Sequence, residues 1–295
     1  MAKMRVVIYG KKFGHEADQM INLLYKELDE RNIESITYGK FAEFIKSRAI
    51  PDFDYPIYSK PKELKGNIDF LISIGGDGTI LDTISSIGDS NIPIVGINTG
   101  RLGFLANNAK EEVSNVLDNL SNGYYRMEER SLLSVQTEEN VFSDYNFALN
   151  EVTIHKKDTS SMLTLHTYVN GEFLNSYWAD GLIISTPTGS TAYSLSCGGP
   201  ILAPDSTSFI INPIAPHNLT ARPIIVPDNA EIKVRVEGRE DEFLVTLDSH
   251  SKSLNDQTEI ILKKCDFKIK LIQFPNQNFF KTIRQKLLWG QDKRN

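Results

Sequence analysis

The chain has 295 residues, of which 40% are hydrophobic and 24% are charged. A chain of this length usually forms two domains, and the composition excludes a wholly disordered, collagen-like or coiled-coil protein. The net charge is -6, so the protein lacks the overall positive field that would attract nucleic acid or an anionic membrane.

The cysteine content and the apolar segments bear on location. Cys197 and Cys265 are too few for a disulfide framework, which favours a reducing compartment, and we expect a cytoplasmic protein. The first apolar run ends at Gly10 and is too short for a signal peptide. The longest segment without a charge, 181–204, is rich in Ser, Thr, Gly and Pro, so we expect no membrane span.

In the first part of the chain, expected strands alternate with expected helices. Met20, Leu24 and Leu28 recur at helical spacing after the first strand. Asn108 and Glu111 have the spacing of a capping box for a helix that runs through 120. Strands are predicted at 6–9, 35–38, 69–74 and 92–97, and further helices at 41–47 and from about 79. This alternation predicts a parallel sheet wrapped by helices.

The pattern changes after Gly123 to that of antiparallel strands with one buried face. Asn170 and Gly171 give a strong hairpin signal between two apolar runs. Strands are predicted at 131–137, 148–155, 163–169, 232–236, 243–247 and 269–271. At the end of the chain Phe280, Ile283 and Leu287 share one helix face.

The first candidate site lies between a buried strand and a helix, and consists of Gly75, Gly76, Asp77, Gly78 and Thr79. Glycines allow a sharp turn and a close approach to a ligand, and the helix N-terminus favours phosphate. The motif is neither a Walker A loop nor a full dinucleotide fingerprint. A carboxylate beside phosphate groups is repelled by them, so its presence indicates a function such as accepting a proton or binding a metal. The alternative is a tight turn whose Asp77 caps the helix.

Three further segments are weaker signals on their own. Residues 98–104 follow the next strand and can form a second wall of the same cleft, or an ordinary loop. The Asn150-Glu151 pair suits an adenine edge and a hydroxyl, although such pairs are common. Asp248 ends an alternating strand, where it faces a cleft or closes a hairpin, and the spacing favours the hairpin.

The uncharged segment 181–204 is the most informative. Its hydroxyl groups can bind a nucleoside while Tyr193 stacks on the base, and Asp180 can hold a ribose hydroxyl or a carboxamide. The alternative is a Ser/Thr-rich surface loop. Ser190 lacks the context of a hydrolase nucleophile, and the five histidines form no zinc pattern, so we expect no protein-bound structural metal.

Taken together and in this order, the motifs resemble those of the NAD kinase family, in its bacterial ATP-NAD kinase form. The stretch from Thr186 to Ser196 with the Asn150-Glu151 pair is highly specific, whereas lipid kinases share the loop at 75–79. The resemblance rests on Gly75 to Thr79, Asn98 to Gly100, Leu102 to Phe104, Asn150-Glu151, Asp180-Gly181, Thr186 to Ser196, Gly198 to Pro200, Arg222-Pro223 and Asp248.

This resemblance implies a Rossmann-like α/β domain over 1–126 and a β-rich sandwich domain over 127–274 that binds NAD. The last helix, 275–295, would pack back on the first domain, and the active site would lie between the domains. The implied reaction transfers the γ-phosphoryl group of ATP to the 2′-hydroxyl of the adenosine ribose of NAD, with Mg²⁺ or another divalent cation. A homodimer or homotetramer is implied, with no nucleic acid or membrane partner.

The resemblance also implies roles for individual residues. Asp77 would accept the proton, Glu151 would lie at the ribose and pyrophosphate, and Asp248 near the transferred group. Asp180 and Ala215 would lie at the nicotinamide end. The phosphate and nucleotide contacts would come from Gly75, Gly76, Gly78, Thr79 and Phe104, and the adenosine pocket and its surroundings from Asn150, Thr188, Thr191, Ala192, Tyr193, Ser194, Leu195 and Ser196.

Two positions depart from the family pattern: Trp178 stands where relatives often have a basic residue, and Ser249 where many have glycine. Two alternatives stay open beside the NAD kinase interpretation. A lipid kinase would use the same loop at 75–79 but would need an apolar pocket. A non-catalytic nucleotide sensor would have the same pocket with an inactive Asp77.

Overall fold

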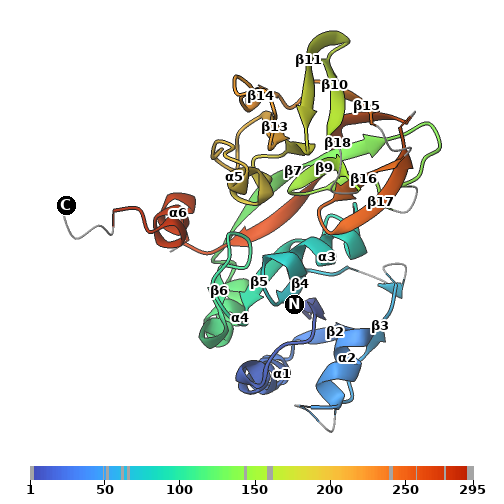
Figure 1. The fold of residues 1–295 in the computed structure, drawn as a ribbon. Coiled ribbons are helices and arrows are strands. Elements are labelled where there is room, and N and C mark those ends of the chain that lie inside the picture. Colours follow the sequence, from blue (N-terminus) through green and yellow to red (C-terminus); the bar gives the residue numbers. More distant parts are fainter. Residues whose placement is uncertain are drawn as a thin grey trace. The chain divides into compact units, whose positions relative to one another are not determined.

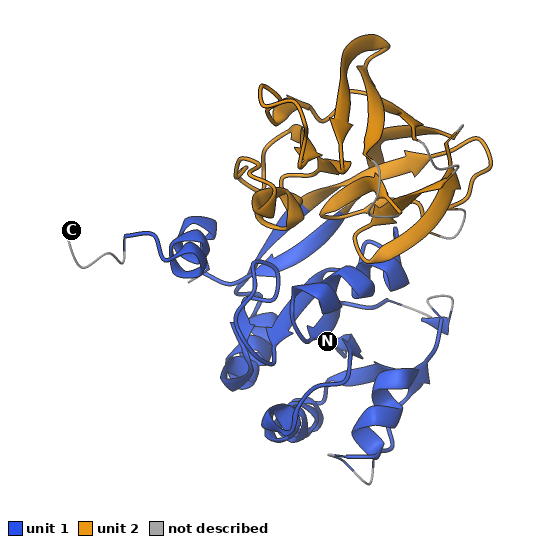
Figure 2. Cartoon of the chain, viewed as in Figure 1, with its two compact units in different colours: residues 1–129, 269–295 blue, residues 130–268 orange. Residues whose placement is uncertain are grey.

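The computed structural model describes residues 3–48, 50, 53–60, 63–64, 67–142, 145–157, 162–238, 242–256, 258–275 and 277–290. The chain divides into two compact units (Figure 2): unit 1 comprises residues 1–129 and 269–295, and unit 2 comprises residues 130–268. Unit 1 is an α/β unit and unit 2 is rich in strands (Figure 1), as the sequence predicts. No helix within the described residues is long and apolar enough to cross a membrane.

Unit 1 contains a parallel sheet in the order β3-β2-β1-β4-β5. The strands are β1 (Arg5–Gly10), β2 (Glu34–Tyr38), β3 (Ile57–Tyr58), β4 (Phe70–Ile74) and β5 (Ile94–Asn98). The short β6 (Asn108–Ala109) and the end of β18 (Glu259–Gln273) also pair with β5 in parallel. Every residue of β4 and β5 is buried, because helices cover both faces of this sheet.

The helices of unit 1 are α1 (Asp18–Glu30), α2 (Gly39–Lys46), α3 (Asp77–Ile87), α4 (Val113–Asn122) and α6 (Phe279–Leu287). Ile72 of β4 belongs to the same hydrophobic cluster as Leu24 of α1 and Leu117 of α4. On the opposite face of β4, the Ser73 hydroxyl lies 3.1 Å from that of Thr83 in α3. The two sides of the sheet are therefore covered by different helices.

Two helix predictions differ from the structure in detail. No full capping box forms before α4: Glu112 Oε2 accepts the N–H of Ala109 at 2.8 Å, but alanine has no side-chain acceptor to complete the motif. Asn108 is buried in β6 and donates its side-chain N–H to the Gly96 carbonyl at 2.8 Å. At the C-terminus, α6 buries only Ile283 among its residues, and Phe280 is 61% exposed. The apolar face that the sequence gives to α6 is thus only partly covered in unit 1.

Unit 2 is a sandwich of two antiparallel layers around one hydrophobic cluster. The first layer contains β7 (Arg126–Gln136), β8 (Phe147–Ala148), β10 (Leu163–Val169), β11 (Glu172–Ala179), β15 (Ile232–Glu237) and most of β18. The second contains β9 (Glu151–Lys156), β12 (Gly181–Ser185), β13 (Ser208–Ile214), β14 (Ile224–Pro227), β16 (Glu242–Leu247) and β17 (His250–Asn255). The short α5 (Tyr193–Ser196) follows β12.

The turns of unit 2 confirm two sequence predictions and correct a third. Asn170 and Gly171 have φ angles of 52° and 81°, as a two-residue hairpin requires, and they join β10 to β11. Asp248, with φ of 51°, lies in the hairpin between β16 and β17. The strand predicted at 148–155 is interrupted at Leu149 and Asn150, whose backbone N–H groups bond to the Asp248 carboxylate instead of a neighbouring strand.

Candidate active site

The turn between β4 and α3 holds the glycine-rich motif in unit 1. Gly75 has φ of 146°, a conformation that only glycine adopts without strain, and a Cβ there would overlap the Thr79 hydroxyl. By contrast, a Cβ on Gly76 or Gly78 would meet nothing within 4 Å. The chain therefore leaves open space beside the amino end of α3, which is the end of a helix that favours phosphate.

The Asp77 carboxylate is held by three consecutive backbone N–H groups of the loop after β5. Phe104 donates to Oδ2 at 2.8 Å, whereas Leu105 and Ala106 donate to Oδ1 at 3.0 and 2.9 Å. The side chain does not cap α3, whose N-cap is Gly76. The turn at 75–79 and the loop at 98–106 are therefore joined through this one carboxylate.

A close approach of two chain segments makes this arrangement possible. Gly103 is buried, and a Cβ on it would overlap the Asp77 carboxylate. Its N–H donates to the Ala106 carbonyl at 2.9 Å, which closes the loop tightly around the carboxylate. The sequence pattern at 98–104 included Phe104 but not Leu105 or Ala106. Their contribution comes from backbone atoms, which leave no signal in residue type.

In unit 2, the Asp248 carboxylate organises the segment that contains Asn150 and Glu151. Oδ2 accepts the N–H of Leu149 at 2.8 Å, and Oδ1 accepts those of Asn150 and Glu151 at 2.9 and 3.2 Å. Burial raises the pKa of Asp248 to about 6, although these three hydrogen bonds and nearby His250 act in the opposite direction. Asp248 thus fixes the backbone of the Asn-Glu pair.

Glu151 is buried, with 9% of its surface exposed, and its Oε2 accepts no hydrogen bond among the described residues. Burial, together with the nearby Asp248 carboxylate, raises the pKa of Glu151 to about 8, and the backbone N–H of Tyr193 offsets part of this. At neutral pH the side chain therefore carries a proton and can donate a hydrogen bond.

Most hydroxyl groups of the segment 185–196 point into unit 2 rather than to solvent. Ser185, Thr186, Thr188, Ser190 and Ser194 are all buried. Their partners are internal: for example, Ser190 Oγ donates to the Pro187 carbonyl at 2.7 Å, and Thr188 Oγ1 accepts from Arg130 Nη1 at 3.5 Å. These side chains build the turn, so the surface that a ligand can reach is smaller than the sequence indicates.

The accessible part of this segment is the 3₁₀ turn and short helix at 189–196. Thr191, Ala192 and Leu195 are half-buried, Ser196 is exposed, and Tyr193 is 41% exposed. Burial on one side raises the pKa of the Tyr193 hydroxyl, with a further contribution from Cys197. One aromatic face beside buried Glu151 is therefore available to a planar ring.

Asp180 and Ala215 lie side by side where β12 follows β11. The Asp180 N–H donates to the carbonyl of Ile214, the neighbour of Ala215, at 3.0 Å. The Asp180 carboxylate pairs with Lys156 Nζ at 2.6 Å, a partner that the sequence did not indicate. Nearby, the ring of Trp178 packs on that of His217 with centroids 4.3 Å apart. Trp178, one of the two expected departures from the family pattern, thus forms an aromatic pair with His217.

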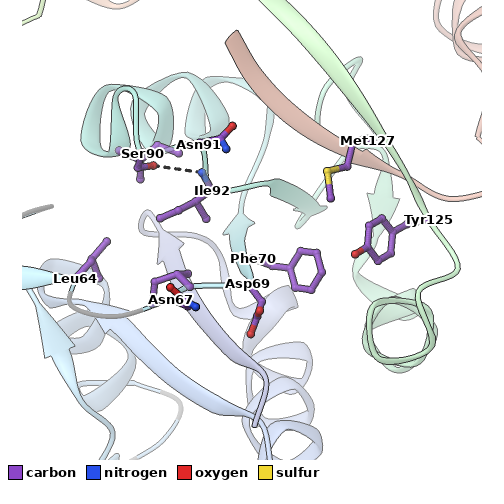
Figure 3. A pocket seen from close by; sticks show the side chains of 11 residues that line it. Leu64, Asn67, Asp69, Phe70, Ser90, Asn91, Ile92, Tyr125 and Met127 are labelled. Carbon is purple, nitrogen blue, oxygen red and sulfur yellow. Dashed lines mark hydrogen bonds between the residues drawn. The ribbon is translucent and has the colours of Figure 1, made fainter. Parts of the chain in front are cut away.

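Other features of the described residues do not bear on this chemistry. They include no cluster of three or more His, Cys, Asp or Glu side chains suited to a metal ion. A cavity of about 590 Å³ lies at the amino ends of β4 and β5, where Phe70, Ile92, Tyr125 and Met127 point toward it (Figure 3). Asp77 follows the carboxyl end of β4, so this cavity is at the opposite edge of the unit 1 sheet.

Unit 1 offers an acid in a glycine-rich turn, and unit 2 offers an accessible aromatic ring beside a buried glutamate. These features suit a nucleotide-dependent kinase. Two family models match the chain: the ATP-NAD kinase N-terminal domain at residues 5–125 and its C-terminal domain at 149–274. The chain belongs to the ATP-NAD kinase family. The chain is therefore a kinase, which excludes the alternative of a non-catalytic nucleotide sensor. The family assignment also excludes the lipid kinase alternative.

Relatives and solved structures agree with this assignment. The chain is 48% identical to an NAD kinase of Flavobacterium johnsoniae over 99% of this chain and all of that protein, and 40% identical to one of Bacteroides fragilis with the same coverage. It is similar in fold to a yeast NADH kinase complexed with NADH, with a TM-score of 0.86 and 24% identity. That match covers 98% of this chain and 88% of the yeast chain. An NAD kinase from Archaeoglobus fulgidus in complex with ATP gives a TM-score of 0.73 at 27% identity, and the match covers 97% of this chain and 99% of that one. The expected fold and NAD kinase function are confirmed.

Proposed function

We propose that the chain transfers the γ-phosphoryl group of ATP to the 2′-hydroxyl of the adenosine ribose of NAD, forming NADP. The observation that carries this proposal is the Asp77 turn, in which an acid is fixed beside a helix N-terminus that has room for phosphate. A ribose hydroxyl is a poor nucleophile until it loses its proton. A positioned carboxylate that accepts this proton accelerates such a step by about 100- to 10,000-fold.

Within this mechanism the proton acceptor is Oδ2 of Asp77. A carboxylate has about four lone-pair positions. The loop N–H groups occupy two on Oδ1 but only one on Oδ2. The loop therefore orients the carboxylate and leaves Oδ2 able to accept one more hydrogen bond, from the substrate hydroxyl.

The phosphates of ATP would lie against the turn at 75–79. Gly76 and Gly78 leave space there, and Gly75 and Thr79 shape the turn. Phosphate charge also requires neutralisation, which Mg²⁺ supplies in such reactions. The described residues fit a cation held mainly by the phosphates, since they offer no carboxylate cluster and Asp77 is already hydrogen-bonded.

NAD would bind the accessible surface of unit 2. Tyr193 offers a face for the adenine ring, with Asn150, Thr191, Ala192 and Ser196 around it, and Leu195 at the edge. Protonated Glu151 would donate to a ribose or pyrophosphate oxygen. Asp180 and Ala215 would contact the nicotinamide end of NAD. Asp248, Thr188 and Ser194 would act through the backbone and side chains that they fix.

We also propose a cytoplasmic homodimer or homotetramer. Both cysteines are free thiols, which fits a reducing compartment. The oligomer is the arrangement that the family resemblance implies.

The deciding assay mixes the protein with NAD, ATP and Mg²⁺ and measures NADP with an NADP-specific dehydrogenase. We expect ATP-dependent NADP; its absence while NAD still binds would overturn the proposal. Gly78→Ala tests the phosphate contact. Because a Cβ there meets no protein atom, the variant should fold normally but bind ATP at least about tenfold more weakly. Unchanged ATP affinity would place the phosphates elsewhere.

A further inference from the structure

Lys156 and Asp180 lie opposite each other on two neighbouring strands of unit 2. The backbone N–H of Lys156, the last residue of β9, donates to the Asp180 carbonyl at 3.0 Å, just before β12 begins. The next pair along the two strands is His155 with Gly181, where a Cβ on the glycine would overlap the Ile154 carbonyl. Residues opposite each other in an antiparallel pair project to the same side of the sheet, so the backbone brings the two charged side chains together.

These side chains form an ion pair that is partly shielded from water. Lys156 Nζ lies 2.6 Å from Asp180 Oδ1, and the two side chains are 22% and 38% exposed. Trp178, two positions before Asp180, contributes no charge, and its ring packs on that of His217. Within the part of the chain that the structure describes, Lys156 is the cation that offsets the negative charge of Asp180.

Asp180 also lies near the accessible surface of unit 2. Burial is the main reason that the pKa of the Tyr193 hydroxyl is raised, with smaller contributions from Cys197 and from the charges of Asp180 and Glu151. The Asp180 carboxylate is therefore within electrostatic reach of Tyr193. Because Glu151 carries a proton at neutral pH, Asp180 supplies the negative charge beside this aromatic ring.

The charge at this place bears on which redox form of the dinucleotide binds. The nicotinamide ring is a cation in NAD and is neutral in NADH, and the rest of the molecule is the same in both. A lone carboxylate beside the ring would attract the oxidised form and give the reduced form no such advantage. A carboxylate whose charge is offset by a lysine discriminates much less between the two forms.

We propose that Lys156 sets the redox selectivity of this site: it offsets the charge of Asp180, so that NAD and NADH bind with similar affinity. The inference rests on the proposed function, in which Asp180 contacts the nicotinamide end of NAD. Lys156 acts through Asp180 and is therefore a positioning residue, whose effect is measured in the choice between two substrates.

Separate equilibrium titrations of the full chain with NAD and with NADH test the proposal. The wild-type Kd values should agree within about fivefold, and a larger difference would overturn it. Lys156→Gln leaves Asp180 unpaired, so the ratio of the NADH Kd to the NAD Kd should rise by about 3- to 10-fold. Asp180→Asn leaves Lys156 unpaired and should lower this ratio by a similar factor. The double variant Lys156→Gln/Asp180→Asn lacks both charges and should return to the wild-type ratio.

Two further variants separate charge from packing. Lys156→Arg keeps the charge and should keep the wild-type ratio. Lys263→Gln is the matched control, because Lys263 Nζ pairs with Glu231 Oε2 at 2.8 Å in the other layer of unit 2, and its ratio should be unchanged. General misfolding would weaken the binding of both dinucleotides and leave the ratio as it is.

The outcomes for this inference and for the proposed function are distinguishable. If both dinucleotides bind and NADP is formed, but Lys156→Gln has the wild-type ratio, the inference is wrong and the proposed function stands. A shift of the same size in Lys263→Gln would also overturn the inference, because the effect would then be that of general surface charge. If neither dinucleotide binds to the wild type, the proposed function fails, and the inference fails with it.

Discussion

The Asp77 carboxylate accepts the backbone N–H of Phe104 at 2.8 Å, across 27 residues of sequence. Leu105 and Ala106 complete the same arrangement. Two motifs that appear separately in the sequence thus form one structural element, in which the loop after β5 sets the direction of the acid at the start of α3. The position of the Asp77 carboxylate therefore depends on backbone atoms of that loop.

Asp77→Asn should reduce the kcat for NADP formation by about 100-fold or more, since an amide cannot accept the hydroxyl proton. The shape of the side chain is retained, so NAD affinity should change little. Steady-state kinetics together with equilibrium NAD binding separate the two effects. Near-normal turnover would show that Asp77 is not the proton acceptor.

Gly103→Ala should destabilise unit 1 by roughly 1–3 kcal/mol and lower activity, because the new Cβ would displace the Asp77 carboxylate. Gly100→Ala is the matched control for stability, since the nearest atom to its Cβ is Asn98 Oδ1 at 3.9 Å. Chemical denaturation measures both variants. Equal stability of the two would contradict the close approach of Gly103 to Asp77.

Glu151→Gln should make stability less dependent on pH. The pKa of Glu151 is raised from 4.5 to about 8 in the folded protein, so between these values the folded state retains a proton that the unfolded state releases. The wild-type free energy of unfolding should therefore fall as pH rises through this range, by up to a few kcal/mol, at about 1.4 kcal/mol for each pKa unit.

Glu151→Gln lacks this pH-dependent loss of stability. Its free energy of unfolding relative to that of the wild type should therefore rise from pH 5 to pH 8. Denaturation at several pH values tests this, with Glu172→Gln, an exposed position of the same unit, as the control. A constant difference between Glu151→Gln and the wild type across this range would show that Glu151 is ionised normally.

Tyr193→Ala should weaken NAD binding by about 10- to 100-fold, the usual effect of losing one base-stacking contact, and weaken ATP binding less. Tyr124→Ala removes a tyrosine that is 64% exposed in unit 1 and serves as the control. Separate binding titrations with NAD and ATP measure the effects. A larger loss for ATP would place the adenosine of NAD elsewhere.

The sequence by itself determined the fold class and the positions of the motifs. Apolar runs and periodicity located β4, β5 and α1, and the glycines of 75–79 marked the turn, because these features depend on local backbone and burial preferences. It also located the hairpin at Asn170 and Gly171, where only certain residues adopt the required φ angles.

Only the tertiary structure decided how the candidate site residues act. Leu105 and Ala106 hold Asp77 through backbone N–H groups, and Asp248 fixes Asn150 across 98 residues, so neither relationship appears in residue types or spacing. The same is true of the hydroxyl groups at 185–194: the sequence shows that they can bind a ligand, but burial and internal hydrogen bonds commit most of them to the fold. Hydrogen-bond partners are set by which segments meet in space, and that is a property of the packed chain.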